Sequence, residues 1–281
     1  MKTRLIGAHV SIQGGVFNAP QRARQLGANA MAMFVKNQRR WRDRAFDYEV
    51  VQSFKEQLHL AGIASQNVLV HSGYLINLGS PDITVRTNSV AALVDEIQRC
   101  EQLGLSRLVL HPGSHLRQIS ERNCLQLIAE GVNAALDETA NVMILLENTA
   151  GQGSNLGYNF EQLASIIGQV GQAERIGVCI DTCHLWAAGY DLSQEDSYQA
   201  TWLSFERLIG WSFLYGIHIN DSKGGCGSHL DRHAGLGMGA MGSKVLLRLL
   251  ADERLAVVPW VLETPNYELW SKEISWLRAN G

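Results

Sequence analysis

Residues 107–147 read RLVLHPGSHLRQISERNCLQLIAEGVNAALDETANVMILLE, and this stretch decides the fold. It begins and ends with short apolar runs, 107–111 and 142–147, that are rich in branched residues and favour β-strands. Between them, apolar residues recur at helical spacing from Leu125 to Leu136, and Ser120 is placed to cap that helix. Two strands joined by a helix are typical of a parallel sheet, because a parallel pair needs a crossover connection.

The same pattern repeats along the whole chain of 281 residues. Eight strand-like runs begin 25 to 44 residues apart: Leu5–Val10, Ala30–Val35, Asn67–His71, Arg107–His111, Val142–Glu147, Ile176–Asp181, Leu214–Asn220 and Val258–Glu263. They are apolar without strict alternation, which indicates a sheet covered on both faces. We therefore predict one α/β domain, residues 1–281, folded as a single (β/α)8 TIM barrel. A doubly wound open sheet is the alternative, because eight units do not prove that the sheet closes.

Composition excludes several classes of protein. Hydrophobic residues make up 46% of the chain and charged residues 18%, which is typical of a globular protein. The longest apolar runs, such as 255–262, are much shorter than the ~18 residues that a membrane-spanning helix needs. His9, Ser11 and Gln13 interrupt any signal-peptide core near the start of the sequence. We expect no membrane association and a cytoplasmic location.

Cysteine number and net charge narrow the function further. The five cysteines are odd in number and lie in a chain of ordinary size, so we predict free thiols rather than a disulfide framework. The formal net charge of -3 provides no overall attraction to nucleic acid. Binding to DNA or RNA therefore requires a local basic patch or bound cations.

Six of the eight predicted strands end in a side chain that can bind a metal: His71, His111, Glu147, Asp181, His218 and Glu263. In a barrel the carboxyl ends of the strands converge on one face, where active sites are built. His184 follows the sixth strand, and Asp231 and His233 lie in the glycine-rich loop after the seventh. We predict that these nine side chains surround one pocket.

The types of these side chains indicate the metal and the chemistry. Histidine and carboxylate together favour zinc or a related transition metal over calcium or magnesium. Nine ligands exceed the three protein ligands that one catalytic zinc usually takes, so two or three ions are expected. Four of the nine are carboxylates, which would repel one another unless cations compensated them. A cluster of divalent ions attracts an anionic substrate and is suited to phosphodiester hydrolysis.

Two loops on the same predicted face carry side chains suited to DNA. Residues 36–44, KNQRRWRDR, hold five cations and one carboxylate, and could follow phosphates while Arg39 enters a groove. Residues 71–78, HSGYLINL, place Tyr74 and Leu75 next to a predicted ligand, where they could wedge between bases. Local packing within solvated loops is the alternative for both segments.

The chain resembles the endonuclease IV family of zinc-dependent apurinic/apyrimidinic endonucleases almost from end to end. The motifs that carry the resemblance are IGAHVS (6–11), KNQR (36–39), YLINLG (74–79), HPGSH (111–115), ENTAGQGSNLG (147–157), CIDTCH (179–184), HINDSK (218–223) and LETP (262–265). Two positions depart from the family pattern: Met238, where an acidic residue is usual, and His229, just before the DRH triplet. Neither is an expected ligand, so the departures concern loop conformation and DNA contacts.

The resemblance implies a DNA-repair hydrolase that acts on duplex DNA containing abasic sites. Such an enzyme cleaves the backbone 5′ to the abasic sugar and leaves a 3′-hydroxyl and a 5′-deoxyribose phosphate. By motif, the first zinc ion takes His71, His111 and Glu147; the second takes Glu147, Asp181, His218 and Glu263; the third takes His184, Asp231 and His233. Manganese could substitute for zinc at one of the three sites. No obligatory protein partner is implied.

The resemblance also implies roles in DNA binding and catalysis. Arg39, Tyr74 and Leu75 would enter the minor groove while the abasic nucleotide is flipped into the pocket. We hypothesise that a metal-bound hydroxide attacks the phosphorus, with Glu263 positioning it or accepting its proton and Glu147 bridging two ions. A metal-dependent sugar isomerase or epimerase is the competing hypothesis, although it leaves the third ligand set and the basic loop unexplained. A non-catalytic metal-dependent DNA-binding protein is a third.

Overall fold

Eight parallel strands form a closed barrel in the computed structural model, which describes residues 4–281. The strands are β1 (Ile6–His9), β2 (Ala30–Met33), β3 (Val68–His71), β4 (Arg107–Leu110), β6 (Met143–Glu147), β8 (Ile176–Asp181), β9 (Leu214–His218) and β12 (Trp260–Leu262). They follow one another around the barrel in chain order, and β1 closes it by pairing with β12, with Ala8 opposite Leu262. The predicted barrel is confirmed. The open-sheet alternative is wrong, because the first and last strands pair.

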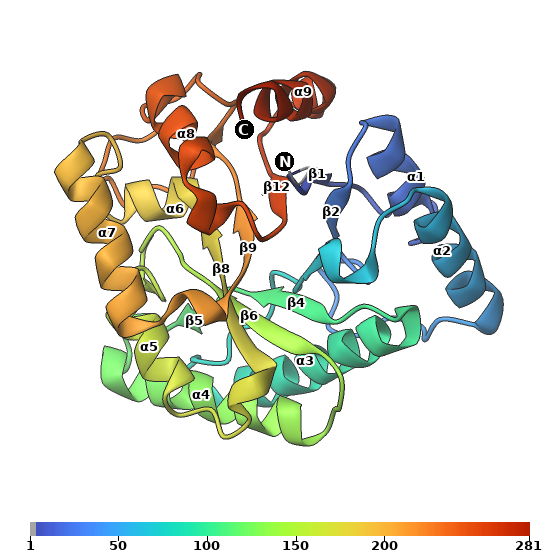
Figure 1. Ribbon diagram of the computed structural model, residues 1–281. Coiled ribbons are helices and arrows are strands. Elements are labelled where there is room, and N and C mark those ends of the chain that lie inside the picture. The colour runs from blue at the N-terminus through green and yellow to red at the C-terminus, as the bar shows by residue number, and fades with distance from the viewer. Residues whose placement is uncertain (1–3) are drawn as a thin grey trace.

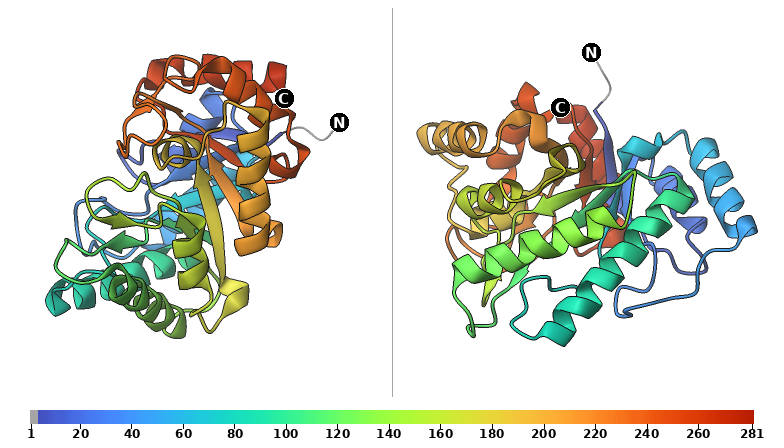
Figure 2. Two further views of the ribbon diagram at one scale, coloured as in Figure 1. Left: turned by 90° about the vertical axis from the view of Figure 1, so that its left-hand side faces the viewer. Right: turned by 90° about the horizontal axis from the view of Figure 1, so that it is seen from below.

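The helices form an outer ring around the strands (Figure 1). They are α1 (Asn18–Gln25), α2 (Tyr48–Leu60), α3 (Ile83–Leu103), α4 (Glu121–Asp137), α5 (Phe160–Ile167), α6 (Thr182–Ala187), α7 (Glu195–Leu208), α8 (Gly242–Ala251) and α9 (Trp270–Asn280). Short 3-10 turns lie at Ser65–Asn67, Ala173–Arg175, Trp211–Phe213, Glu253–Leu255 and Tyr267–Leu269. Figure 2 shows α3 and α4 side by side along the outside of the barrel.

Side-chain caps fix where the crossover helices begin. The Ser120 hydroxyl accepts a hydrogen bond from the backbone N of Asn123 at 3.2 Å, so the predicted cap of α4 is confirmed. Asp47 and Asp82 cap α2 and α3 in the same way. At its other end, α3 stops at Gly104, whose φ of 74° is a left-handed conformation that glycine adopts without strain. Helices α2, α3 and α4 therefore begin, and α3 also ends, where local sequence favours it.

Apolar residues pack in two layers. The larger layer lies between the strands and the helices and contains fully buried aromatic side chains such as Phe54, Phe160 and Trp202. A smaller cluster fills the inside of the barrel with one residue each from six strands: Ala32, Leu69, Val109, Leu145, Cys179 and Val261. Glycine at position 216 leaves room there, because a Cβ at this position would lie 2.7 Å from Leu69 Cδ1. The interior is thus a packed core and supports the strand ends above it.

Two short ribbons on the loops were not anticipated from the sequence. β5 (Gly113–Ser114) pairs antiparallel with β7 (Asn155–Leu156), and β10 (Asp221–Ser222) pairs antiparallel with β11 (His233–Ala234). The buried Asp221 carboxylate also accepts hydrogen bonds from the backbone N atoms of Gly239, Met241 and Gly242. These contacts fix the long loop after β9, which carries two of the predicted metal ligands.

All five cysteines are free thiols, as predicted, and only Cys226 is exposed. Across residues 4–281, no helix is both long enough and apolar enough to pass through a bilayer.

Substitution of Leu145 by Ala tests the importance of the barrel interior. Leu145 is fully buried in the smaller cluster, so Leu145→Ala should lower the free energy of unfolding by about 2–5 kcal/mol, measured by denaturant titration. The matched control Leu203→Ala removes an exposed side chain of α7 and should change it by less than about 0.5 kcal/mol. Equal effects of the two substitutions would contradict a packed interior.

Candidate metal centre

The nine predicted side chains lie together at the carboxyl ends of the barrel strands. His71, Glu147, Asp181 and His218 are the last residues of β3, β6, β8 and β9, while His111 and Glu263 follow β4 and β12 by one residue. His184 lies in the first turn of α6, and Asp231 and His233 lie in the loop after β9. Since parallel strands end on the same face, residues far apart in the sequence meet there.

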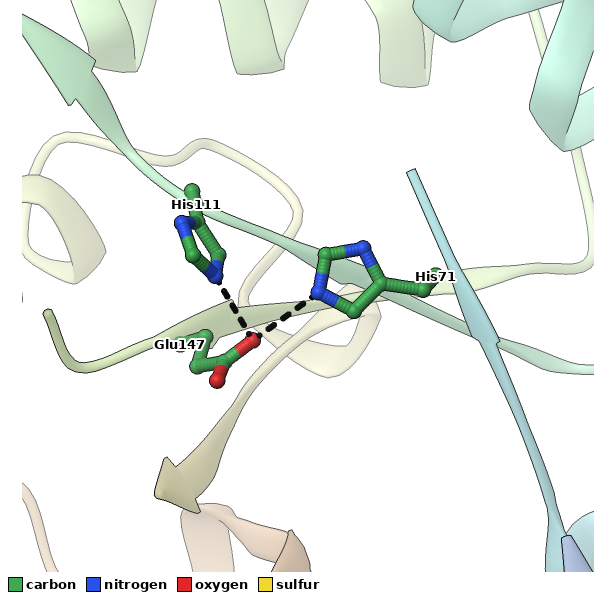
Figure 3. Close-up of side chains that lie close together, drawn as sticks. All are labelled: His71, His111 and Glu147. Carbon is green, nitrogen blue, oxygen red and sulfur yellow. Dashed lines mark hydrogen bonds and ion pairs between the residues drawn. The ribbon is translucent and has the colours of Figure 1, made fainter. Parts of the chain in front are cut away.

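Glu147 occupies the centre of this group and is completely buried. Its Oε2 atom lies 3.2 Å from His71 Nε2 and 3.1 Å from His111 Nε2, so both imidazoles point at the same oxygen (Figure 3). Its Oε1 atom lies 3.0 Å from His218 Nδ1 and 3.4 Å from His184 Nδ1. The two oxygens therefore face two different sides of the pocket, which is the arrangement needed to bridge two cations.

Glu263 is held by a histidine that the sequence analysis did not assign. His9, at the end of β1, has Nδ1 2.7 Å from Glu263 Oε1, while His218 Nδ1 lies 3.3 Å from Glu263 Oε2. The backbone N of Glu263 donates to Asn220 Oδ1 at 2.9 Å. His9 lies within the IGAHVS motif, and its position at a strand end was the signal that could have identified it.

A further group surrounds Asp231. Its Oδ1 atom lies 3.1 Å from His184 Nε2 and 3.6 Å from His233 Nε2. Asp181 Oδ2 also lies 3.6 Å from His233 Nε2, so Asp181 stands between this group and Glu147. The third predicted ligand set is thus brought together, with Asp181 as an additional neighbour.

Neutral amides fix the orientation of Asp181. Asn220 Nδ2 donates to Asp181 Oδ2 at 2.7 Å, and Asn148 Oδ1 accepts from the backbone N of Asp181 at 2.7 Å. Asn148 also accepts a hydrogen bond from His184 Nδ1 through its backbone carbonyl. These two asparagines orient the predicted ligands Asp181 and His184, and the sequence analysis missed both.

The hydrogen bonds of three histidines fit a cation in the pocket. Nδ1 of His71, His184 and His233 lies 2.9 to 3.2 Å from a backbone carbonyl oxygen, which requires a proton on that nitrogen. Nε2 of each of these three rings then faces a carboxylate. Within residues 4–281, the Nε2 atoms of His184 and His233 are buried and have no hydrogen-bond partner. A lone pair facing a carboxylate needs either a second proton or a metal ion between them. The donor set of imidazole nitrogen and carboxylate oxygen suits zinc.

Electrostatics support the same conclusion. Burial alone would raise the pKa of Glu147, but the neighbouring His218 and His111 hold it well below its usual range. Burial opposes the charged form of His184, yet Asp181 and Asp231 raise its pKa well above the ordinary value. The Glu147 carboxylate thus stays ionised because positive charge lies beside it. Metal ions would supply that charge in place of protons.

The side chains open into a cavity of about 380 Å³. Six of its lining residues are predicted ligands, and the others are His9, Phe34, Tyr74 and Trp270. Tyr74 is 66% exposed and meets the Phe34 ring edge-on at 5.6 Å between centroids. Leu75 and Arg39 are exposed on the neighbouring loops. The three predicted DNA-contacting side chains therefore lie on the face that carries the cavity.

One member of the basic segment does not belong with the others. Lys36 was grouped with the cations that follow phosphates, but its side chain is buried against α3 and paired with Asp95 and Glu96. That part of the prediction is wrong, because a side chain enclosed by protein cannot reach DNA. The exposed cations of the segment are Arg39, Arg40, Arg42 and Arg44.

Comparisons with known proteins agree with this arrangement. A family described as "Xylose isomerase-like TIM barrel" matches residues 20–280. The chain is 48% identical over 275 residues to "Probable endonuclease 4" of Campylobacter concisus (strain 13826), covering 98% of this chain and 97% of the relative. The crystal structure of endonuclease IV from Thermus thermophilus aligns with a TM-score of 0.85 at 34% identity over 98% of each chain.

A sugar-modifying enzyme shares the fold alone. The 3-keto-D-glucoside 4-epimerase from E. coli aligns with a TM-score of 0.67 at 12% identity over 98% of this chain and 99% of that one.

Proposed function

This chain belongs to the endonuclease IV family, and from that premise we propose that it is a DNA-repair hydrolase acting at abasic sites in duplex DNA. The proposed cut lies 5′ to the abasic sugar and leaves a 3′-hydroxyl and a 5′-deoxyribose phosphate. The observation that carries the proposal is the complete set of nine ligand-type side chains at one end of the barrel, beside exposed Arg39 and Tyr74. A cytoplasmic location, a single domain and action without an obligatory protein partner stay predictions.

We propose that three zinc ions occupy the centre, with manganese able to replace one of them. The residues that would hold them are His71, His111 and Glu147; Glu147, Asp181, His218 and Glu263; and His184, Asp231 and His233. Zinc, when bound, supplies a Lewis acid that polarises phosphate oxygens and lowers the pKa of water.

The chain's own groups orient the reaction. His9 fixes Oε1 of Glu263, which leaves Oε2 on the side of His218 as the atom that accepts a proton from the attacking water. Asn220 holds the backbone of Glu263 and His9 holds its Oε1 atom, so together they keep this carboxylate directed into the pocket. Phe34 and Trp270 line the same cavity and give it apolar walls. The cavity of about 380 Å³ supports a flipped sugar-phosphate that lacks a base.

Selectivity for damage would come from the two exposed loops. Extruding a nucleotide without a base costs less than extruding one that is stacked and paired. Arg39, Tyr74 and Leu75 would fill the space left in the duplex. The metal-dependent sugar isomerase or epimerase has less support, because likeness to such enzymes extends to the fold alone and leaves the exposed arginines without a role.

Metal content provides the first test. Elemental analysis of the purified protein should find close to three transition-metal ions per chain, mostly zinc, and strong chelation should abolish activity. His233→Ala should selectively lower the content of one ion, whereas the control His59→Ala, on the exposed end of α2, should leave it unchanged. One ion or fewer in fully active protein would exclude the trinuclear centre.

Cleavage of a duplex with one abasic-site analogue tests the activity and the role of Glu263 together. The parent should cut once, 5′ to the lesion, and Glu263→Gln should slow the cut by ~10²-fold or more because the amide cannot accept the proton. Circular dichroism should be nearly unchanged. The control Glu253→Gln lies before β12, at the other end of the barrel, and should cut normally. Normal cleavage by Glu263→Gln at full metal content would remove Glu263 from this role.

Affinity measurements test the wedge. In the Glu263→Gln background, Arg39→Ala/Tyr74→Ala should weaken binding to abasic duplex by about tenfold, and binding to intact duplex by less, because only the abasic complex uses these side chains. Arg42→Ala, which removes an exposed cation, should weaken both duplexes similarly and reduce the salt dependence. Fluorescence titrations at several salt concentrations measure both effects. Equal losses for the double substitution would reject the wedge, and no DNA binding by the parent would favour the sugar isomerase.

A further inference from the structure

A buried ion pair lies beneath the basic segment. The Lys36 and Glu96 side chains are each 1% exposed, and Lys36 Nζ lies 3.3 Å from Glu96 Oε1. Lys36 follows β2, whereas Glu96 lies in the middle of α3. Nζ also donates to the backbone carbonyls of Trp41 at 2.9 Å and Ala92 at 3.3 Å, and to Asp95 Oδ2 at 2.9 Å. The amine thus ties the loop after β2 to the helix.

The same carboxylate holds the neighbouring loop. The backbone N of Gly73 donates to Glu96, with both carboxylate oxygens 3.2 Å away. A Cβ on Gly73 would lie 3.0 Å from Glu96 Oε1 and 3.3 Å from the Gln38 carbonyl oxygen, so only glycine fits without displacement. The backbone N of Tyr74 donates to that Gln38 carbonyl at 3.0 Å. Glu96 therefore contacts the two loops at once, and the loops contact each other.

We propose that the Lys36–Glu96 pair holds the Arg39 loop (residues 36–46) and the Tyr74 loop (residues 71–78) as one unit, and thereby sets the preference for abasic over intact DNA. This inference rests on the proposed function. Lys36 and Glu96 are positioning residues, since neither reaches the surface. Their effect on DNA passes through Arg39 and Tyr74, which are exposed on the two loops.

The chemistry of the pair fits positioning better than stabilisation. Burial raises the pKa of Glu96 to about 7, although Lys36 opposes the shift, which reflects the cost of placing charges away from water. Apolar side chains of similar size would often be as stable. A charged pair, however, offers donors and acceptors in fixed directions to three backbone groups, those of Trp41, Ala92 and Gly73.

Holding the two loops together would strengthen the complex with abasic DNA more than the complex with intact DNA. Arg39 and Tyr74 must meet the same gap in the duplex, so a fixed spacing removes the cost of ordering two loops separately. Intact duplex offers no gap and gains little from that spacing. Loss of the pair should therefore lower the preference for abasic DNA more than it lowers general affinity.

The test replaces the pair with apolar side chains of similar length, Lys36→Met/Glu96→Met, in full-length metal-loaded protein carrying Glu263→Gln. Affinity for abasic duplex should fall about tenfold, while affinity for intact duplex changes less than about twofold. Melting temperature and zinc content should stay near those of the parent. With Glu263 restored, single-turnover cleavage at saturating DNA should stay within about threefold of the parent, because the metal ligands are untouched. The control Arg248→Met/Glu195→Met removes an ion pair between α7 and α8 and should leave both affinities, the zinc content and the cleavage rate unchanged, while the melting temperature should fall because Arg248 also donates to the carbonyls of Leu192 and Ser193.

Combination with the wedge substitutions separates positioning from a general structural effect. In protein that already carries Arg39→Ala/Tyr74→Ala, loss of the pair should cause little further loss of preference, because the side chains it positions are absent. A full additional loss there, an equal loss on both duplexes, or an unchanged preference would overturn the inference. If the double Met variant does not fold, Lys36→Met alone, which removes the links from Nζ to the Trp41 carbonyl and to Glu96, is measured in the same assays, and an unchanged preference again overturns the inference. If the parent itself shows no preference for abasic DNA, both the proposed function and this inference are overturned. If the parent prefers abasic DNA and the variant prefers it equally, only the role of the Lys36–Glu96 pair is overturned.

Discussion

The carboxylate of Glu147 sets the main electrostatic constraint on this protein, because it is charged and has no contact with water. Four imidazole nitrogens surround it at 3.0 to 3.4 Å, and three more acidic side chains lie beyond them. Such a group is stable only with compensating positive charge in its centre. Protons on the histidines can supply this positive charge. Metal ions can supply it as well, and they can also take part in a reaction. The arrangement of the whole catalytic face follows from this requirement.

Closure of the barrel brings the histidines together around the buried carboxylate of Glu147. The four histidines around Glu147 come from β3, β4, β9 and the start of α6, so all of those elements must converge. The pairing of β1 with β12 has a second consequence, because it sets Ala8 opposite Leu262 and thus brings His9 next to Glu263. The contact that closes the sheet therefore also orients the proposed proton acceptor. Stability of the fold and orientation of the site depend here on the same strand pair.

The sequence predicted the barrel, and the meeting of the nine ligand-type side chains at one end of it, for one physical reason. A ligand-type residue at the end of a parallel strand has a known destination, so position in the chain translates directly into position in space. Other features lacked such a rule. Asn148 and Asn220 are neutral, and their role depends on hydrogen bonds across strands. Lys36 lies within a run of arginines, and nothing nearby in the sequence reveals that its partner is Glu96 on α3. The two-residue ribbons that fix the loops are too short to produce any periodicity.

The two loops proposed to contact DNA must combine exposure with order. Tyr74 is 66% exposed, so little of its own packing can hold its loop in place. Order must then come from beneath, where Ile76 and Leu78 pack into the core and polar partners fix backbone N–H and C=O groups such as the N–H of Gly73. Arg99 adds a second charged link in the opposite direction, since Lys36 reaches from the loop to α3 whereas Arg99 extends from α3 to a loop carbonyl, that of Asp43, at 2.6 Å. Helix α3 is therefore more than a crossover that covers the sheet. Its buried charged side chains stabilise the fold less than apolar contacts would, but they fix the geometry of two loops whose tips remain in solvent.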